Sequence, residues 1–586
     1  DFTPSRLDKN SEYSVVKTYM AHHQGLILLS LNNLFNDNIL QKRFMGNPEI
    51  EAVDILLQER MPENIIVTKE RKEKVEKSKN ALNMGSYSIE RDKVNNDLNI
   101  AGIVANENYS IIVDQKGNGY SKFKNIRVNR FKRTDYEEQG IFFAIKDVSM
   151  GKVWYNTEKN IGKKSDKYHV NIAPDSIKFS RTDGYITTNT KITVDSNDAL
   201  EIRALEIYNN SNEDKIFEVT SYFEPILSTA NQDDAHKAFN NLFLKFDFED
   251  NILWVKRKDI YMGVTLYSFD EDGRLEFETD KEKFIGRNNF EIPEYIKNSS
   301  QFENNASLAP NPIVAVKRTF EIKANNKSEL CLLISIADSK EKARKILLEK
   351  LTKENVNRCF ELSRVRIEAE NRYLAVKGED AILYNKILTY MVFGNPLKKI
   401  RYKKNNAHIQ HLQSDLWKYG VSGDLPILTV RIDEVNNIHI VEQAIKAFEY
   451  LKRKNINMDL VILNTEDERH GMYVEEEVLK IINSRNIDYL KNISGGIFLV
   501  KAKEKEIFEI CSDVFLDSDK GKISKQLEDI EEEYVKSLPS INRDEISSNI
   551  NISEVSEEVY TDMQKLIYYN DIGGFSEDGK EYNKNK

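Results

Sequence analysis

The 586-residue sequence contains few cysteines and lacks a long apolar run. Its three cysteines, Cys331, Cys359 and Cys511, are too few for a disulfide framework and form no Cys-x-x-Cys pair of the kind that holds zinc. No stretch of about eighteen apolar residues occurs, because polar residues interrupt the most apolar region, 25–35. These absences predict a reducing compartment, no cysteine-bound metal and no membrane-spanning helix, and we expect a cytoplasmic location.

The given sequence shows neither an excess of basic charge nor the pattern of a signal peptide. Lys and Arg total 85 against 95 Asp and Glu, and the net charge of −10 opposes nonspecific binding to nucleic acid, which depends on a basic surface. Residue 1 is Asp1, and no charged segment followed by an apolar stretch precedes the first helical pattern. Hydrophobic residues at 40% and charged residues at 31% are typical of a chain that folds in water.

Helical periodicity dominates the first part of the chain. Apolar residues recur at three- and four-residue steps over 13–34, which predicts a helix with one broad buried face. A second helix is expected between Pro48 and Pro62, since proline is favoured in the first turn of a helix and ends one that precedes it. Two helices bury too little surface to form a domain, so 1–65 is expected to be the end of a larger helical domain. The charged, Asn-rich stretch 66–100 is expected to be a linker.

The pattern then changes to short β-branched and aromatic runs separated by turn signals. The run 110–113 leads to a glycine-rich turn at 117–119, and the run 178–179 leads to a turn at 182–184. Many strands at such short spacing predict one large antiparallel β-sandwich over 101–325.

Strands and helices mix in the rest of the chain. A strand at 330–336 and two following helices assign 326–395 to a strand with linker helices. In 396–520, buried apolar strands alternate with amphipathic helices, which predicts a small parallel α/β layer with right-handed crossovers. The strands of this layer are expected at 426–432, 458–463 and 496–500, and its helices at 438–452, 474–482 and 505–514. The acidic and polar remainder, 521–586, is expected to be a connector.

Two adjacent histidines lie within the first predicted helix. Because neighbouring side chains on a helix project about 100° apart, His22 and His23 do not share a metal ion as an i, i+4 pair does. Imidazole, amide and phenol groups all bond sugar hydroxyls, so Tyr19, His22, His23 and Gln24 are candidates for a polar pocket that binds a glycan. No metal site is predicted.

The other motifs favour structural roles over catalysis. The turn at 117–119 lacks the spacing of a phosphate-binding loop, and the segment 420–424 lacks that of a nucleophile elbow. The latter is expected to be a tight loop entering a strand, where Asp424 caps or binds. The carboxylates at 233–234 beside His236 suggest acid/base chemistry, although adjacent carboxylates usually mark a solvated turn. No constellation supplies a nucleophile with its base or an acid/base pair, so no catalytic residue is predicted.

Several stretches together resemble one family of glucan-processing proteins. The helical start resembles the end of the glycoamylase-like domain of cyclic β-1,2-glucan synthases in the motifs 19–25, 43–44 and 56–62. The β region resembles the β-supersandwich of glycoside hydrolase family 94, formerly glycosyltransferase family 36, in the motifs 118–121, 147–148, 181–184, 220–224 and 234–239. The α/β layer is similar, at 416–426 and 459–464, to a segment that the synthases share with 1,2-β-oligoglucan phosphorylases.

The resemblance implies a multidomain, mainly β protein, in which a galactose mutarotase-like β-supersandwich follows a helical hairpin and precedes the small α/β layer. It also implies phosphorolysis of β-1,2-linked glucan in an (α/α)6 barrel, where an acidic residue protonates the glycosidic oxygen and inorganic phosphate attacks the anomeric carbon. Residues 570–582 resemble the lead-in to that barrel, so the barrel is expected to be absent from this chain and no catalytic carboxylate is carried over. No cofactor is expected, and inorganic phosphate would be a substrate of the parent activity.

The leading hypothesis is a carbohydrate-binding and assembly portion of a cyclic β-1,2-glucan synthase or phosphorylase-type protein, inactive alone. To the helical candidates for glycan binding we add His236, Trp417 and Asp424. The expected partners are β-1,2-glucan or a related oligosaccharide, flanking catalytic domains and, through the sandwich, a second copy of the chain; nucleic acid is not expected. One alternative is an enzyme that becomes active when flanking or partner chains complete it. The other is a structural dimerisation sandwich that binds no sugar.

Overall fold

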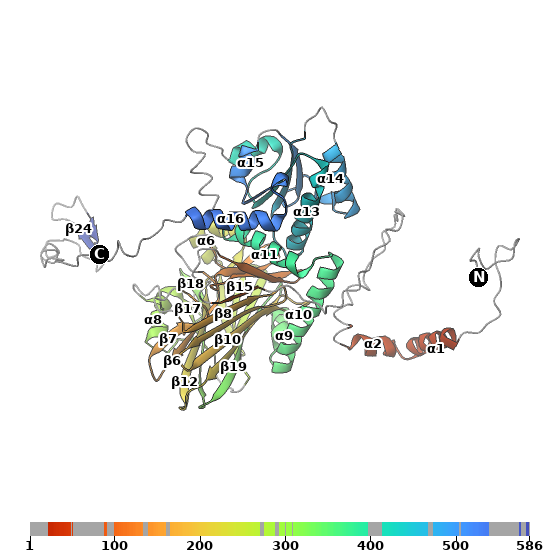
Figure 1. Cartoon of the computed structure of the whole chain (residues 1–586). Helices are drawn as coiled ribbons and strands as arrows, with labels where there is room; N and C mark the ends of the chain where they lie inside the picture. The colour runs from red at the N-terminus through yellow and green to blue at the C-terminus, as the bar shows by residue number, and fades with distance from the viewer. Residues whose placement is uncertain are drawn as a thin grey trace. The chain divides into compact units, whose positions relative to one another are not determined.

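The structure is a computed structural model of the chain (Figure 1). The residues it describes are 21–47, 50, 87–90, 99–132, 139–159, 165–269, 275–286, 292–298, 301–306, 309–395, 413–466, 473–502, 505–537, 573–575 and 582–584. The chain divides into two compact units, Asp1–Glu532 and Glu533–Lys586. In the second unit, β24 (Gly573–Phe575) and β25 (Tyr582–Lys584) form an antiparallel pair.

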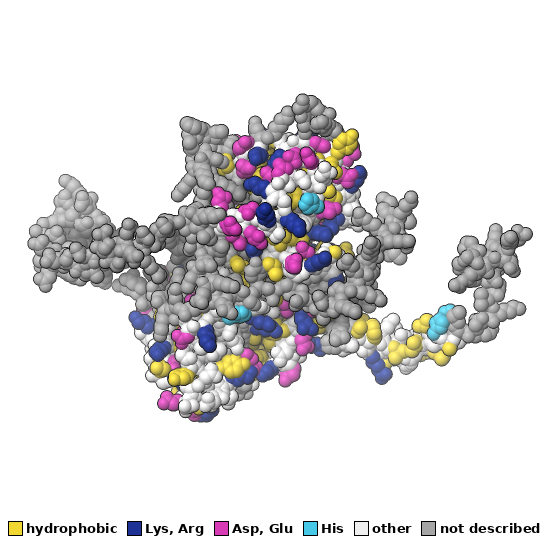
Figure 2. All heavy atoms as spheres, in the orientation of Figure 1, with side chains coloured by type: hydrophobic (Ala, Val, Ile, Leu, Met, Phe, Trp, Pro, Cys, Tyr) yellow, Lys and Arg dark blue, Asp and Glu magenta, His cyan; other side chains and the backbone are white. Residues whose placement is uncertain are grey.

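Two helices open the described part of the chain. α1 spans Ala21–Phe35 and α2 spans Ile39–Met45, and neither contains a buried residue. Apolar side chains lie at the surface of α1 (Figure 2), where Leu28 is 67% exposed. The predicted helix is therefore present over its described residues, but its predicted burial is not found, because the short α2 is the helix that packs against it. The second predicted helix, 48–62, lies outside the described residues except for residue 50.

Three antiparallel sheets form the central sandwich (Figure 1). The largest has nine strands in the order β1-β8-β9-β10-β11-β19-β16-β15-β14. These strands are β1 (Tyr87–Glu90), β8 (Lys167–Ile172), β9 (Ile177–Asp183), β10 (Ile186–Val194), β11 (Leu200–Asn209), β14 (Lys245–Glu249), β15 (Ile252–Arg257), β16 (Ile260–Ser268) and β19 (Asn326–Ala337). The large antiparallel sandwich predicted from the sequence is thus confirmed.

Two five-stranded sheets complete the sandwich, in the orders β17-β18-β12-β6-β7 and β13-β5-β4-β3-β2. The first contains β6 (Phe142–Asp147), β7 (Lys152–Tyr155), β12 (Lys215–Phe223), β17 (Glu276–Asp280) and β18 (Pro312–Ile322). The second contains β2 (Ala101–Ala105), β3 (Tyr109–Asp114), β4 (Gly119–Phe123), β5 (Ile126–Asn129) and β13 (Pro225–Ser228). Short helices lie in the connections: α5 (Ala230–Ala235), α6 (Lys237–Asn241), α7 (Lys281–Ile285) and α8 (Glu294–Lys297).

Alternation of side chains explains why these segments form half-buried strands. In β9, Ile177 and Phe179 are buried in the sandwich core, and Phe217 of β12 belongs to the same core. Lys178 and Ser180, which alternate with these two residues along β9, lie on the opposite face of the sheet, as the two-residue period of a strand requires. The nine-stranded sheet therefore has one face in the core and one outward face.

The predicted turn at 117–119 is confirmed as the hairpin between β3 and β4. Gly117 and Gly119 have φ values of +89° and +150°, and a Cβ added to Gly119 would lie 1.9 Å from the carbonyl oxygen of Ile112. The Asp114 carboxylate accepts a hydrogen bond of 2.8 Å from the backbone N–H of Asn118. Glycine is required here because no larger residue fits against the neighbouring strand.

Helices cover part of the outward face of the nine-stranded sheet. These helices are α9 (Lys340–Leu348) and α10 (Lys353–Tyr373), and α11 (Gly378–Val392) follows them in the chain. Leu347 of α9 and Phe360 of α10 pack with Trp254 and Leu333 of the sheet in one apolar cluster. A Cβ on Gly263 would lie 2.7 Å from Leu347, so the absence of a side chain there lets α9 approach β16 closely.

The small α/β layer is a parallel four-stranded sheet in the order β22-β21-β20-β23, flanked by helices. Its elements are η3 (Gln413–Tyr419), β20 (Ile427–Ile432), η4 (Val435–Asn437), α13 (Ile438–Arg453), β21 (Asp459–Asn464), α14 (Tyr473–Ser484), η6 (Asp488–Leu490), β22 (Ile497–Lys501), α15 (Glu506–Cys511), β23 (Val514–Asp517) and η7 (Ser518–Lys520). The predicted layer is confirmed, with one correction. The third helix was expected to run to residue 514, but it ends at Cys511 and Val514 begins a fourth strand that pairs with β20.

Hydrogen bonds join the α/β layer to the sandwich within the first unit. Asn455, directly after α13, donates from Nδ2 to the carbonyl oxygen of Asn106 at 3.0 Å and accepts at its own carbonyl from Lys122 Nζ at 3.1 Å. Thr389 of α11 accepts a bond of 2.9 Å from the backbone N–H of Ala101. These bonds connect the sandwich to the α/β layer through Asn455 and to α11 through Thr389.

Two regions predicted to be connectors contain regular structure. β1 lies inside 66–100 and pairs with β8 as an edge strand. α16 (Ile523–Ser537) lies inside 521–586, and its residues Ile523 and Leu527 are fully buried. Among the helices of the described residues, none is both long enough and apolar enough to cross a lipid bilayer.

Candidate functional site

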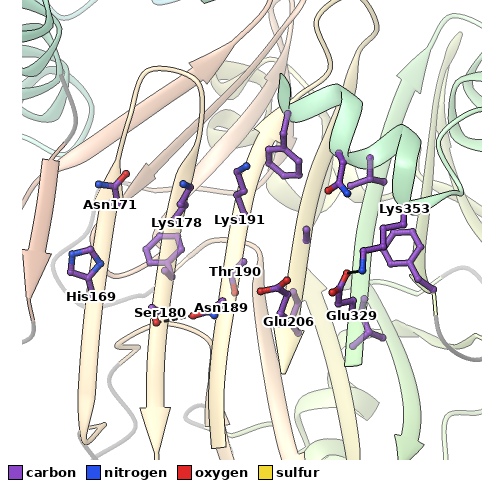
Figure 3. Close-up of a pocket in the computed structure, with 18 residues that line it drawn as sticks. His169, Asn171, Lys178, Ser180, Asn189, Thr190, Lys191, Glu206, Glu329 and Lys353 are labelled. Atoms are coloured by element: carbon purple, nitrogen blue, oxygen red, sulfur yellow. Dashed lines mark hydrogen bonds and ion pairs between the residues drawn. The ribbon is translucent and has the colours of Figure 1, made fainter. Parts of the chain in front are cut away.

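A pocket of about 630 Å³ lies on the outward face of the nine-stranded sheet, beside α10 (Figure 3). It begins where the apolar cover of α9 and α10 ends, and polar side chains of the sheet replace the apolar ones there. Its volume is within the range of small-molecule sites, roughly 300–1,000 Å³. The pocket is the candidate functional site because it joins an apolar wall to several converging polar groups.

The strand register arranges these polar groups in two rows. In the first row, Lys178 of β9 lies directly between Asn171 of β8 and Lys191 of β10. In the second row, His169, Ser180, Asn189, Glu206 and Glu329 follow one another across β8, β9, β10, β11 and β19. Figure 3 shows both rows on one face of the sheet. The first row is cationic, and the second supplies hydroxyl, amide, imidazole and carboxylate groups.

The second row is held in place by its own hydrogen bonds. Ser180 Oγ donates to Asn189 Oδ1 at 2.7 Å, which fixes the amide plane and leaves the amide N–H donors for another partner. Lys327 Nζ lies 3.3 Å from Glu206 and 2.6 Å from Glu329, and Lys353 Nζ of α10 lies 2.7 Å from Glu329. Bridged in this way, the two carboxylates are rigid hydrogen-bond acceptors at the end of the row.

The charge of Glu329 argues against this carboxyl acting as a general acid. Partial burial raises the pKa of this carboxyl, but hydrogen bonds from Lys327 and Lys353 outweigh burial, and the pKa is lowered from its ordinary value. A group that protonates a glycosidic oxygen must hold its proton near neutral pH, which requires a raised pKa. Glu329 is therefore an ionised binding group and not a proton donor.

α10 forms the wall of the pocket. Its N-cap Thr352 accepts a bond from the backbone N–H of Asn355, which starts the helix, and Val356 and Phe360 face the sheet. Lys191 Nζ lies 4.0 Å from the centre of the Phe360 ring. Phe269, which is half-buried, adds a second aromatic side chain to the lining.

The predicted helical candidates lie outside this pocket. His22, His23 and Gln24 are exposed on α1, where the two imidazole rings stack edge to face with centres 4.2 Å apart. Tyr19 lies outside the described residues. Their role in glycan binding stays a prediction.

Trp417 and Asp424 meet at the loop before β20. Trp417 Nε1 donates to the Ser422 carbonyl oxygen at 3.1 Å, and Gln413 Nε2 donates both to that oxygen and to Asp424 Oδ1, each at 2.9 Å. Asp424 therefore caps the tight loop, in which Gly423 has a φ of +75°. The Trp417 side chain is 64% exposed, and its binding role, like that of Asp424, stays a prediction.

His236 lies exposed between α5 and α6, next to a buried ion network that sequence reasoning missed. Asp233 is 1% exposed, and Arg130 binds both of its carboxylate oxygens at 2.6 and 2.7 Å. The solvated turn predicted at 233–234 is therefore wrong for Asp233, because an arginine 103 residues earlier in the chain neutralises it. A single sequence carries no signal of such a pair, since local spacing does not report it.

The same arginine also binds Glu224, whose other oxygen accepts from Lys281 Nζ at 2.6 Å. Burial raises the pKa of Glu224, but Lys281, Lys237 and Arg130 outweigh burial and lower the pKa from 4.5 to about 2. Among the described residues, no group of three His, Cys, Asp or Glu side chains is arranged to hold a metal ion. The network is thus a structural anchor for the segment that carries His236.

Three antiparallel sheets, with helices over part of the outward face of the largest, define a protein of the β-sandwich class. Residues 86–353 match the family model of the glycosyl hydrolase 94 supersandwich domain. This region carries that domain, and the family resemblance seen in short motifs is confirmed.

Whole-chain similarity points the same way. The chain is 26% identical over 614 aligned residues to the cyclic beta-(1,2)-glucan synthase NdvB of Rhizobium meliloti (strain 1021), covering 99% of this chain and 21% of the synthase. The chain thus spans about a fifth of the length of this curated relative.

Two of the matches to solved structures each cover half of this chain. A bacterial glucoamylase complexed with acarbose has a TM-score of 0.32 and 14% identity, covering 50% of this chain and 40% of the other. A putative kojibiose phosphorylase from the human microbiome has a TM-score of 0.31 and 10% identity, covering 50% and 38%.

Proposed function

We propose that this chain is a carbohydrate-binding and assembly portion of a β-1,2-glucan synthase or phosphorylase-type protein, and that the sheet-face pocket binds β-1,2-glucan. The observation that carries the proposal is the second row of the pocket, where imidazole, hydroxyl, amide and carboxylate groups from five adjacent strands face one open space. Similarity to a cyclic beta-(1,2)-glucan synthase supports glucan as the ligand.

The chemistry of the pocket suits a sugar. Each sugar hydroxyl both donates and accepts, so it pairs with the amide donors of Asn189 and with the side-chain oxygens of Glu206. The apolar faces of sugar rings contact side chains such as Phe269 and Val356 at the wall. A partly apolar pocket with a few fixed polar groups is the usual form of a small-molecule site.

The proposed role is binding without catalysis by this chain alone. Lys327 and Lys353 lower the pKa of Glu329, so this carboxylate of the pocket stays ionised and does not supply the proton that glycoside cleavage requires. The assembly role is supported by the hydrogen bonds of Asn455, which join the α/β layer to the sandwich. Cytoplasmic location and dimerisation through the sandwich stay predictions.

Binding is tested by calorimetric titration of the chain with β-1,2-glucan oligosaccharides. We expect saturable binding, and we expect Asn189→Ala to weaken it about 5-fold, because a hydrogen bond contributes about 1 kcal/mol. Asn212→Ala, at the exposed turn after β11, is the matched control and should leave the affinity unchanged. No binding by the unaltered chain, or equal loss in both variants, would reject the pocket as a glucan site.

Two further measurements separate the alternatives. Release of glucose 1-phosphate from β-1,2-glucan and inorganic phosphate by the purified chain would overturn the view that it is inactive alone. Light scattering that shows a dimer, together with a titration that shows no sugar binding, would favour the purely structural sandwich.

A further inference from the structure

Two lysines occupy neighbouring positions in the first row of the pocket. Lys178 of β9 and Lys191 of β10 are directly paired across the strands. In the part of the chain that the structure describes, neither lysine forms an ion pair, whereas the nearby Lys327 and Lys353 are both bound to carboxylates. Like charges placed opposite each other on a sheet repel, so this pair weakens the sheet unless an anion joins it.

Among the described residues, no carboxylate forms an ion pair with Lys178 or Lys191 that would offset this repulsion. Lys191 is partly buried against Phe360, and burial and then the charge of Lys178 lower its pKa. The other charges that act on Lys191 are Asp175 and Glu361, which favour its charged form, and Arg364, which opposes it. An anionic group of a ligand, bound between Lys178 and Lys191, would relieve the repulsion between the two ammonium groups.

We propose that the pocket binds a sugar that carries a phosphate monoester, with the phosphate between Lys178 and Lys191 and the sugar ring on the row that contains Ser180 and Asn189. This inference rests on the proposed glycan-binding function and deepens it, because it names a charged substituent for the ligand. The two rows lie side by side on the sheet (Figure 3), so one ligand spans both.

The geometry favours phosphate over a carboxylate as the anion. Opposed side chains on neighbouring strands have Cβ atoms about 4.5–5.5 Å apart, so two ammonium groups converge on one anion. A phosphate monoester carries close to two negative charges and three acceptor oxygens at neutral pH, which matches two point-like cations. A planar carboxylate is matched better by the fork of an arginine, and no arginine lies in the lining of this pocket among the described residues.

The test uses the full chain and three soluble probes: glucose 6-phosphate, glucose and inorganic phosphate. Calorimetric titration should show glucose 6-phosphate binding at least about 10-fold more tightly than either of the others, and raising NaCl should weaken it, because salt screens the ion pairs. Lys178→Gln and Lys191→Gln should each weaken the binding of glucose 6-phosphate about 5- to 10-fold, and this loss should be larger than the loss that the same changes cause with a neutral β-1,2-glucan oligosaccharide. Lys167→Gln is the matched control, because Lys167 is an exposed lysine on the same face of β8 outside the pocket lining.

The outcomes separate this inference from the function on which it rests. If the neutral glucan binds but glucose 6-phosphate binds no tighter than glucose, the phosphate site is overturned and the glucan site stands. Inorganic phosphate that binds as tightly as glucose 6-phosphate overturns the sugar part, since the lysines then take free phosphate. A chain that binds glucose 6-phosphate through Lys178 and Lys191 but binds no glucan supports the phosphate site and rejects the glucan function.

Discussion

Replacing Glu224 with glutamine should make the sandwich less stable at neutral pH and change its response to acid. Glu224 accepts from Lys281 and Arg130, and Lys237 lies 3.4 Å away. Its side chain is 19% exposed, so solvent screens these contacts only in part. Glutamine keeps the shape but removes the charge, so Lys281 and Lys237 lose this carboxylate partner and Arg130 keeps its bonds to Asp233.

The size of the effect follows from the pKa of Glu224, which falls from 4.5 to about 2 in the folded chain. Each unit corresponds to about 1.4 kcal/mol, so the ionised carboxylate contributes about 3 kcal/mol to folding at pH 7. Because the folded pKa is depressed, this contribution is complete above pH 4.5 and disappears as the pH falls toward 2. At pH 3 we expect about 1 kcal/mol to remain.

The assay is urea unfolding followed by tryptophan fluorescence at several pH values between 7 and 3. Trp154 and Trp254 are 6% and 3% exposed in the sandwich, so their emission reports its unfolding. The difference in free energy of unfolding between the unaltered chain and Glu224→Gln should shrink by about 2 kcal/mol from pH 7 to pH 3. Glu213→Gln, at an exposed turn, should show no such change. A difference that is the same at both pH values would refute the ionic origin of the effect.

Three other substitutions test local features of the fold. Gly119→Ala should lower the free energy of unfolding by about 3 kcal/mol, because the added Cβ would meet the Ile112 carbonyl oxygen. Gly184→Ala should lower it by about 1 kcal/mol, because Gly184 has a φ of +62° but open space around it, and thermal unfolding compares the two variants. Leu527→Ala, at a fully buried position of α16, should lower the free energy of urea unfolding by about 2–5 kcal/mol. An equal loss in Glu528→Ala, at an exposed position, would show that the buried face of α16 does not contribute to stability. Burial and neighbouring cations lower the pKa of Lys122 to about 8, so its contribution to stability should rise from pH 8 to 10.5, and Lys122→Met should remove that rise in unfolding measured across this range.

Local signals in the sequence predicted strands at 110–113, 330–336 and 426–432, and the structure has β3, β19 and β20 there. The alternation in 177–183 and the glycines at 117–119 report their own surroundings, because each strand residue faces either the core or the outward side. The two-residue period of β9 puts Lys178 and Ser180 on one face. What it could not predict is which strand lies beside which, so the two rows of the pocket required the register.

Long-range pairing explains the features that were missed. β23 has four residues, all buried, and no alternation that separates it from the end of α15. The Arg130–Asp233 pair joins residues from distant parts of the chain, and Asp233 beside Asp234 has the usual appearance of an exposed turn. Such features arise only when the sheets have formed, because their partners come from other elements.

The position of β19 determines the order in which the nine-stranded sheet can be built. β19 is the last strand of the sandwich along the chain, yet it lies between β11 and β16 and pairs with both. Until residues 326–337 have emerged from the ribosome, each of those strands keeps one backbone edge without its final partner. Unpaired edges recruit other chains. The sheet therefore closes in one late step of synthesis, and translation that stalls before residue 326 leaves two partial sheets that are prone to aggregate.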